Sequence, residues 1–210
     1  MKTITDIKQQ IKNKKRVSVY LDGSYYCSLD LVTAVQNRLK AGMEISEEKL
    51  VEIQYNSEFQ NCFDSALNFI SVSPKTKKQI RDKLIQKGYL EEIVLKVLDK
   101  LAEYGYVNDS DYAEKYVNSY KGQKGKKLIK LELLKKGIKE EDFKEAVDGV
   151  ETQAQAISRL AEKYMRNKDC DLKTIKKLYS HLISKGFDYD EVKEITSIYL
   201  EKAQSEEILD

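Results

Sequence analysis

The chain has 210 residues, of which 41% are hydrophobic and 34% are charged, with one proline and nine glycines. This composition is typical of a helix-rich soluble protein and argues against a β-sandwich. The 37 Lys and Arg residues are nearly balanced by 35 Asp and Glu residues, so net charge alone predicts no nucleic-acid partner. No apolar run approaches the roughly 20 residues of a membrane-spanning helix, and no signal-peptide-like segment follows the N-terminus. We therefore expect a cytoplasmic protein without a membrane partner.

The first thirty residues predict a small antiparallel sheet. Two β-prone runs, residues 17–21 and 25–29, flank the dipeptide Asp22-Gly23. An Asp-Gly turn between such runs is a strong signal for a β-hairpin. Residues 4–11 are the candidate for a third strand.

Two helices are expected after the sheet. A short one covers about residues 30–39 and ends at the dipeptide 41–42. Residues 46–49 have the pattern of a capping box, which predicts the start of a second helix. No strong breaker follows before residue 71, so one long helix or two helices broken near residues 56–57 both fit.

A motif that occurs three times organises the rest of the chain. It reads Leu-x-x-Lys-Gly followed by an apolar residue, and its glycines are Gly88, Gly137 and Gly186, spaced by 49 residues (137 − 88 and 186 − 137). Glycine adopts the positive φ that the residue after a helix often needs, and the preceding lysine favours the negative end of the helix dipole. The motif therefore predicts the end of a helix in each of three tandem repeats.

Each repeat is expected to hold three helices. The first carries an Ala-x-x-aromatic pair, namely Ala66/Phe69, Ala113/Tyr116 and Ala161/Tyr164. The second ends at the Lys-Gly motif. The third has an apolar face, formed in turn by Ile93/Val94/Val97/Leu98/Leu101, Phe143/Ala146/Val147/Val150 and Val192/Ile195/Ile198/Tyr199. Helix starts are marked by the pairs Thr76/Gln79, Asn108/Asp111 and Asp188/Glu191.

The predicted fold is mainly α. Three tandem three-helix, helix-turn-helix-like repeats form an elongated, curved body, preceded by the small N-terminal antiparallel sheet. We place the N-terminal extension at residues 1–57 and the repeats at residues 58–108, 109–152 and 153–210. A unit of under 50 residues has little core of its own, so neighbouring repeats are expected to share apolar faces. Such a long surface suits an extended partner better than a small substrate, and we expect a monomer.

Basic residues gather on the middle helices. From residue 74 to 87 six basic residues accompany one acid, and from residue 121 to 139 eight lysines accompany one glutamate. They form a candidate basic strip that meets phosphates or an acidic protein groove, with an ordinary solvated helix face as the alternative. The strip comprises Lys75, Lys77, Lys78, Arg81, Lys124, Lys126, Lys127, Lys130 and Lys176.

No residue pattern supports catalysis, a cofactor or a metal ion. Cys27, Cys62 and Cys170 are far apart and form no CxxC pair, which argues against disulfides and zinc. The single histidine, His181, has no triad partner, and Walker, GxGxxG and HExxH motifs are absent from the sequence. Most of the 14 tyrosines are interpreted as semi-buried core or repeat-junction residues, with base stacking as the alternative.

Four runs stand out in order along the chain: Lys75-Thr76-Lys77-Lys78-Gln79-Ile80, Gly105-Tyr106-Val107-Asn108-Asp109, Asp111-Tyr112-Ala113-x-x-Tyr116-Val117 and Gly125-Lys126-Lys127-x-Ile129. Through these runs the chain resembles, from about Ala66 to Ile138, the RecX family of regulatory proteins, modulators of the RecA recombinase. The N-terminal run from Arg16 to Gly23 resembles the hairpin extension of some members. Lys75 and Thr76 stand where the family usually has an Arg-Ser pair.

This resemblance implies a non-enzymatic regulator of recombination, DNA repair and the SOS response. Proteins of this family lie in the groove of the RecA–single-stranded-DNA filament and inhibit its ATP hydrolysis and strand exchange. DNA itself is a second candidate partner. The alternative function is a stand-alone DNA-binding protein of helix-turn-helix type, suggested by the lysine-rich middle helices, although no base-reading residue set is evident.

Overall fold

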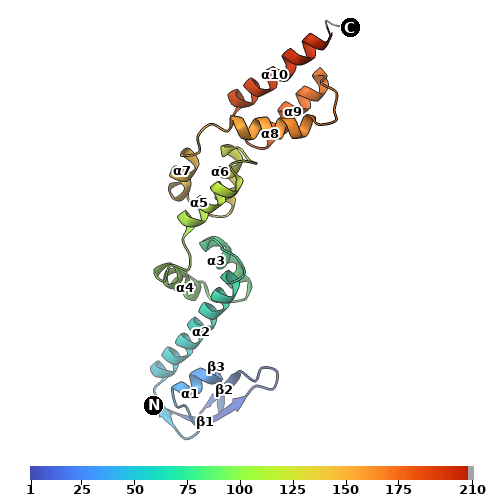
Figure 1. The fold of residues 1–210 in the computed structure, drawn as a ribbon. Helices are drawn as coiled ribbons and strands as arrows, with labels where there is room; N and C mark the ends of the chain where they lie inside the picture. Colours follow the sequence, from blue (N-terminus) through green and yellow to red (C-terminus); the bar gives the residue numbers. More distant parts are fainter. Residues whose placement is uncertain (208–210) are drawn as a thin grey trace. The chain divides into compact units, whose positions relative to one another are not determined.

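The computed structural model of the protein, which describes residues 1–207, divides into two compact units (Figure 1). The first unit consists of residues 1–73 and 80–106. The second consists of residues 74–79 together with the chain from residue 107 onward.

The first unit begins with a four-stranded antiparallel sheet of order β3-β2-β1-β4. The strands β1 (Lys2–Gln9), β2 (Arg16–Leu21) and β3 (Ser24–Asp30) confirm the predicted hairpin and third strand. Asp22 and Gly23 both have positive φ, 46° and 85°, as a tight two-residue hairpin turn requires. The fourth strand, β4 (Glu44–Ile45), was not predicted, because two residues are too short to carry an alternating pattern.

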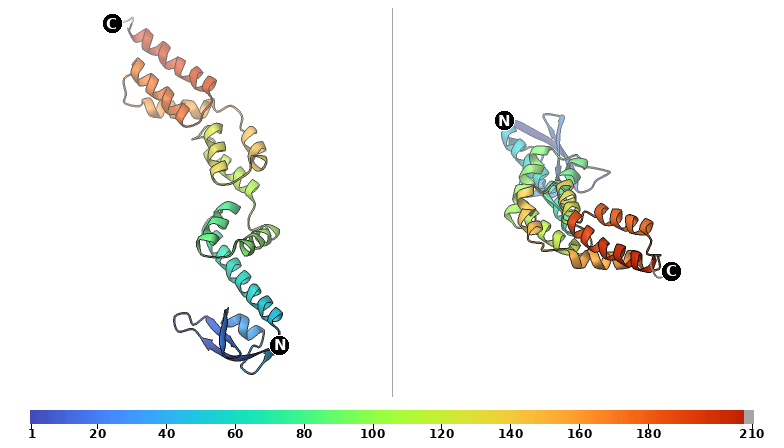
Figure 2. Two further views of the ribbon diagram at one scale, coloured as in Figure 1. Left: turned by 180° about the vertical axis from the view of Figure 1, so that it is seen from behind. Right: turned by 90° about the horizontal axis from the view of Figure 1, so that it is seen from above.

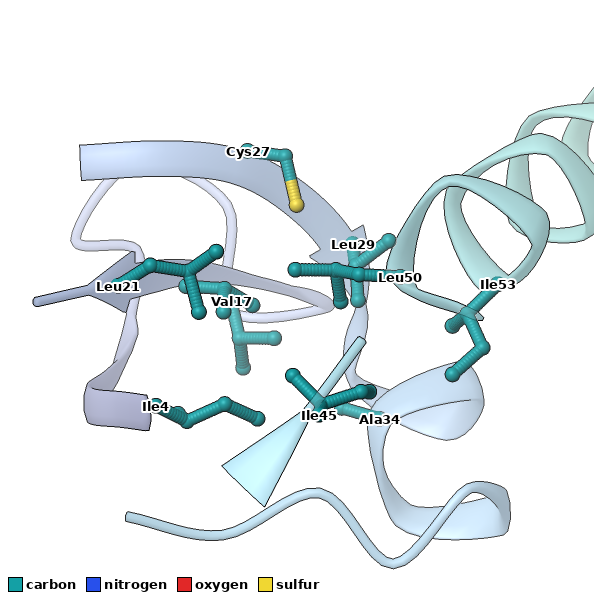
Figure 3. Packing of buried hydrophobic residues seen from close by; sticks show 10 residues of the cluster. Ile4, Val17, Leu21, Cys27, Leu29, Ala34, Ile45, Leu50 and Ile53 are labelled. Carbon is teal, nitrogen blue, oxygen red and sulfur yellow. The ribbon is translucent and has the colours of Figure 1, made fainter. Parts of the chain in front are cut away.

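One face of the sheet packs against α1 (Leu31–Gln36) and the first turns of α2 (Glu47–Ile70). Alternate strand residues point into this core because successive side chains of a strand face opposite sides of the sheet. Figure 3 shows the side chains that meet there: Ile4, Val17, Leu21, Cys27, Leu29, Ala34, Ile45, Leu50 and Ile53.

The predicted end of the short helix was wrong. α1 stops at Gln36, and Arg38 already has a positive φ of 51°. The chain turns early because Gly42 N donates to Ile4 O (2.8 Å) and Ile4 N donates to Met43 O (2.9 Å), so pairing with β1 replaces further helical turns.

The helix α2 is continuous over 24 residues, which excludes the alternative of a break near residues 56–57. Ser46 caps its start, since its hydroxyl accepts a hydrogen bond from Lys49 N at 3.1 Å. Ser57 is buried within the helix and donates to Asp30 Oδ2 at 3.3 Å. The expected boundary between residues 57 and 58 thus falls inside α2.

Three helices form each repeat, as predicted. The second half of α2 is followed by α3 (Lys77–Gln86) and α4 (Glu91–Glu103). Then come α5 (Asp109–Tyr120), α6 (Lys126–Lys135) and α7 (Glu140–Asp148). The last three are α8 (Ala154–Met165), α9 (Leu172–Ser184) and α10 (Tyr189–Glu207), which pack on one another in both views of Figure 2.

The Lys-Gly motif ends the middle helix of every repeat. Its three glycines have φ values of 89°, 80° and 82° in chain order, which confirms the predicted stop. In the second repeat Ile138 N donates to Leu133 O at 3.1 Å, closing a Schellman cap. Ile138 and Phe187, the apolar residues after two of the glycines, are both buried.

Two predicted details of the third repeat were wrong. Ile198 is 59% exposed, and Thr196 takes the buried position instead, with its hydroxyl donating to Val192 O at 2.9 Å. The helix start predicted at Asp188 is confirmed, since α10 begins at Tyr189, but Glu191 does not complete a capping box with Asp188. Asp188 Oδ1 accepts a hydrogen bond from Asp190 N, whereas the Glu191 carboxylate accepts one from the backbone N–H of Gln153, just before α8.

Candidate partner-binding surface

The N-terminus of α3 docks on the Lys-Gly turn that ends α6. Thr76 is fully buried, and its hydroxyl donates to Lys136 O at 2.8 Å. Lys77 N donates to Asp109 Oδ1 at 3.0 Å, so a carboxylate satisfies one of the helix's free amides. The predicted Thr76/Gln79 capping box is confirmed, with reciprocal hydrogen bonds of 3.1 and 3.2 Å.

The N-terminus of α6 docks in the same way on the turn that ends α9. Gly125 corresponds to Thr76 in the repeat (125 − 76 = 49), and its backbone N–H donates to Lys185 O at 2.9 Å. Lys127 N donates to Gly186 O at 3.2 Å. A Cβ on Gly125 would lie much closer than 3.0 Å to the backbone of Gly186. At the junction of α6 with the turn after α9 the donor is therefore the backbone N–H of Gly125, whereas at the junction of α3 with the turn after α6 it is the hydroxyl of Thr76.

The buried side chain of Gln153 stabilises the junction at the N-terminus of α6. Its buried amide donates to Lys121 O (2.7 Å) and to Lys124 O (2.9 Å), and its Oε1 accepts from Lys126 N (3.1 Å). Its own N–H donates to the Glu191 carboxylate at 3.0 Å. Sequence reasoning missed this residue because all partners of its side chain lie 27 or more residues away in the chain.

Several candidate lysines lie at these junctions. Lys77 follows Thr76, and Lys126 and Lys127 follow Gly125. The backbone N–H of each of these lysines donates a hydrogen bond across a junction. Lys78 lies against Gly137, where an added Cβ would collide with its side chain. Lys75 is half-buried, whereas Lys77, Lys78 and Lys127 are exposed. The strip is thus interrupted by the contacts that join the repeats.

Much of the positive charge of the strip has an acidic neighbour. Lys124 Nζ lies 2.7 Å from Glu132, Lys127 Nζ lies 3.3 Å from Asp188, and Lys130 Nζ lies 3.4 Å from Asp148. Arg81 pairs with Glu91 and, at 3.9 Å, with Asp82. Local charge counting could not reveal these pairs, since most of the acids belong to other helices or connections.

Three tyrosines spaced by four residues form a row along α5. Ring centroids of Tyr112 and Tyr116 are 6.2 Å apart, and those of Tyr116 and Tyr120 are 4.5 Å apart. Lys124 Nζ lies 4.1 Å from the Tyr120 centroid, and Lys136 Nζ lies 5.4 Å from that of Tyr116. All three tyrosines are half-buried, in agreement with their interpretation as semi-buried residues.

Glu132 connects this row to the basic strip. Its carboxylate accepts from Tyr116 Oη at 2.7 Å and pairs with Lys124. Burial raises the pKa of Glu132, but the hydrogen bonds from Lys124 and Tyr116 outweigh it and hold that pKa below its usual range. A hollow of about 330 Å³ adjoins the group and is lined by Lys78, Gln79, Tyr116, Glu132, Lys135 and Lys136. The positive charge of Lys124 is thus neutralised within the protein by Glu132.

Lys176, the strip residue of the third repeat, lies in a different setting. It is exposed on α9 and lines a hollow of about 790 Å³ together with Lys173, Lys177 and His181. Tyr179 occupies the repeat position of Arg81 and Lys130, and its ring meets that of Tyr189 edge-on at 5.9 Å. In the 49-residue register α9 therefore keeps the cation of Lys127 as Lys176, lacks that of Lys130, and gains Lys177 in place of Leu128.

The described residues offer no obvious reactive centre. Burial raises the pKa of the Cys27 and Cys62 thiols to about 11, so both are protonated at neutral pH. Among the side chains of residues 1–205 no three His, Cys, Asp or Glu residues gather as a metal site would need. None of the helices in this range combines the length and the apolar character that crossing a membrane would require.

The fold is that of a helical-repeat protein with an N-terminal antiparallel sheet and three three-helix units. Sequence models of RecX domains match it in four segments: the N-terminal domain at residues 2–46 and the first, second and third three-helix domains at residues 62–101, 108–147 and 151–196. The chain belongs to the RecX family of regulatory proteins.

Individual relatives agree with this assignment. A regulatory protein RecX of Clostridium botulinum is 33% identical over 201 residues, covering 93% of this chain and 95% of the relative. One of Clostridium beijerinckii is 33% identical over 216 residues and covers both chains fully. A crystal structure of a regulatory protein RecX matches 94% of this chain and 100% of its own, with a TM-score of 0.67 and 28% identity. That of RecX from Lactobacillus salivarius covers 68% and 96%, with a TM-score of 0.61 and 30% identity.

Proposed function

We propose that this protein binds the RecA–single-stranded-DNA filament and inhibits its ATP hydrolysis and strand exchange, thereby regulating recombination and DNA repair. The observation that carries the proposal is the match to all four RecX domains in order along the chain. In this proposal the protein acts as a cytoplasmic monomer and catalyses no reaction itself.

The basic strip supplies the proposed contact surface. Its residues recur with the 49-residue spacing of the repeats, as in Lys78, Lys127 and Lys176, so one chain offers similar contacts at successive positions. The ion pairs that Lys127 and Lys130 make with Asp188 and Asp148 are exposed and contribute little to stability. These lysines can therefore exchange their internal acids for acids or phosphates of a filament at small cost.

The test is a titration of RecA on single-stranded DNA with the purified full-length chain, following ATP hydrolysis. The proposal predicts a progressive fall in the rate as the chain approaches the concentration of RecA. An unchanged rate at stoichiometric excess would refute it. A helical-repeat protein of similar size and charge from outside this family serves as the control.

A further inference from the structure

The third repeat contains a cationic hollow, and the basic strip proposed to contact the filament includes only one of its lysines, Lys176. It lies on α9, the orange helix next to α8 in Figure 1, and measures about 790 Å³. Lys173, Lys176 and Lys177 line it, spaced by three and four residues so that they share one helix face. The lining also includes Tyr164 of α8 and His181 of α9.

The three lysines differ from the basic residues of the second repeat in their acidic neighbours. Among the side chains of residues 1–205 no carboxylate forms an ion pair with Lys173, Lys176 or Lys177, in contrast to the paired lysines of the second repeat. Asp171 is the nearby acid, but its Oδ1 accepts from Thr174 N at 2.6 Å and so caps the start of α9. That hydrogen bond and the nearby lysines lower the pKa of Asp171.

Comparison with the second repeat shows that the third repeat lacks one carboxylate. In the second repeat, Tyr116, Lys124 and Glu132 form a neutralised group. Their counterparts in the third repeat are Lys173 (173 − 124 = 49), His181 (181 − 132 = 49) and Tyr164, the aromatic residue of the Ala-x-x-aromatic pair, which is offset by 48 (164 − 116). The exchange of glutamate for histidine removes the one negative charge of the group and leaves its cations in place.

His181 provides an uncharged polar group at this point. Its ring lies over that of Tyr164, with centroids 5.0 Å apart and planes inclined by 31°. Burial lowers the pKa of His181, and the charges of Lys185 and Lys168 lower it further. The imidazole is therefore neutral at neutral pH, and the positive charge of the hollow comes from its lysines.

We propose that this hollow binds phosphate groups of single-stranded nucleic acid, which supply the negative charge that Glu132 supplies in the second repeat. Lysine binds phosphate as a point charge. From Lys173 to Lys177 the helix rises by about 6 Å, so the ammonium groups present a row to successive anions rather than converging on a single carboxylate. This binding activity requires no recombinase and goes beyond the proposed inhibition of the filament.

The test measures binding of a fluorescein-labelled oligothymidylate to the full chain by anisotropy at several salt concentrations. Three phosphate contacts contribute about 2 units to the slope of log K against log salt, at about 0.7 per contact for single strands. The K173Q/K176Q/K177Q variant should lose this part of the slope. Across a fourfold rise in salt, wild type should then lose about 20-fold more affinity than the variant does.

Two further variants make the result specific. K49Q/K96Q/K139Q removes the same charge from three exposed lysines that pair with Glu52, Glu92 and Glu141, and should leave the slope near that of wild type. His181→Glu restores the arrangement of the second repeat and should lower the slope as the triple lysine variant does. Circular dichroism establishes that each variant is folded.

The outcomes are distinct. Equal slopes for wild type, K173Q/K176Q/K177Q and H181E would overturn the proposal. So would competition by polyglutamate as effective as that by the oligonucleotide at equal charge, since the hollow would then accept any polyanion. The RecA ATPase titration, run in parallel, reports on filament inhibition separately, so either hypothesis can fail alone.

Discussion

Replacing Gly125 by alanine tests the account of how the second and third repeats are joined. The added methyl group would enter the backbone of Gly186. Gly125 has a φ of −76°, which alanine adopts without strain, so any destabilisation comes from the junction itself. Relief of the clash separates the two backbones and weakens the hydrogen bond from Gly125 N to Lys185 O and that from Lys127 N to Gly186 O.

The expected magnitude follows from these losses. Overpacking costs about 1–3 kcal/mol, and each weakened hydrogen bond about 1 kcal/mol. Restricting the unfolded chain by a Gly→Ala change returns about 0.4–1 kcal/mol. We therefore expect the free energy of unfolding to fall by about 2–5 kcal/mol.

Urea unfolding followed by circular dichroism measures this change. Gly122→Ala is the matched control, because a Cβ there meets only Arg159 at 3.8 Å. It should be neutral, or stabilising by about 0.4–1 kcal/mol. If the Gly125→Ala and Gly122→Ala proteins unfold at the same urea concentration, the close docking of α6 on the turn after α9 is refuted.

Three further predictions concern the second repeat. Leu133→Ala should cost about 2–5 kcal/mol because Leu133 is fully buried, as measured by urea unfolding; a loss below 1 kcal/mol would contradict its place in the core. The lowered pKa of Glu132 means that its ionised carboxylate stabilises the fold above the unfolded-state pKa, so wild type should lose stability as the pH falls through the pKa of Glu132 in the folded protein. Glu132→Gln should be less stable than wild type at neutral pH and should lack this acid-dependent loss. Parallel curves of stability against pH for the two proteins would contradict the stabilising role of the Glu132 carboxylate. Charge reversal in the strip should weaken inhibition of RecA without changing the circular dichroism spectrum, and unchanged inhibition would argue against the strip as the contact surface; the variant is K126E/K127E/K130E.

The fold could be predicted where its signals are local. The Lys-Gly motif fixes helix ends through the glycine at its close, and the Asp22-Gly23 turn fixes the hairpin. The end of α1 could not be predicted, because it depends on pairing between residues 42–43 and Ile4, far away in the sequence. Ile198 was misplaced for a similar reason, since the packing of α10 on α8 and α9 selects the buried face.

The candidate surface was predicted less completely than the fold. Basic residues were found from composition, but the acids that pair with them were not, since Lys127 and Asp188 are 61 residues apart (188 − 127). Gln153 and Gly125 gave no periodic signal, although their hydrogen bonds join two repeats. The replacement of Glu132 by His181 was readable from the 49-residue register, but its meaning depends on the contacts of Glu132.

The most direct test of the account is the structure of the RecA–single-stranded-DNA filament with this protein bound, determined by electron cryomicroscopy. The account predicts that α3, α6 and α9 face the filament and that Lys78, Lys127 and Lys176 contact its acids or phosphates. A filament that carries no bound chain at stoichiometric excess would contradict it. Contacts made only by the N-terminal sheet, with those lysines turned to solvent, would contradict it as well.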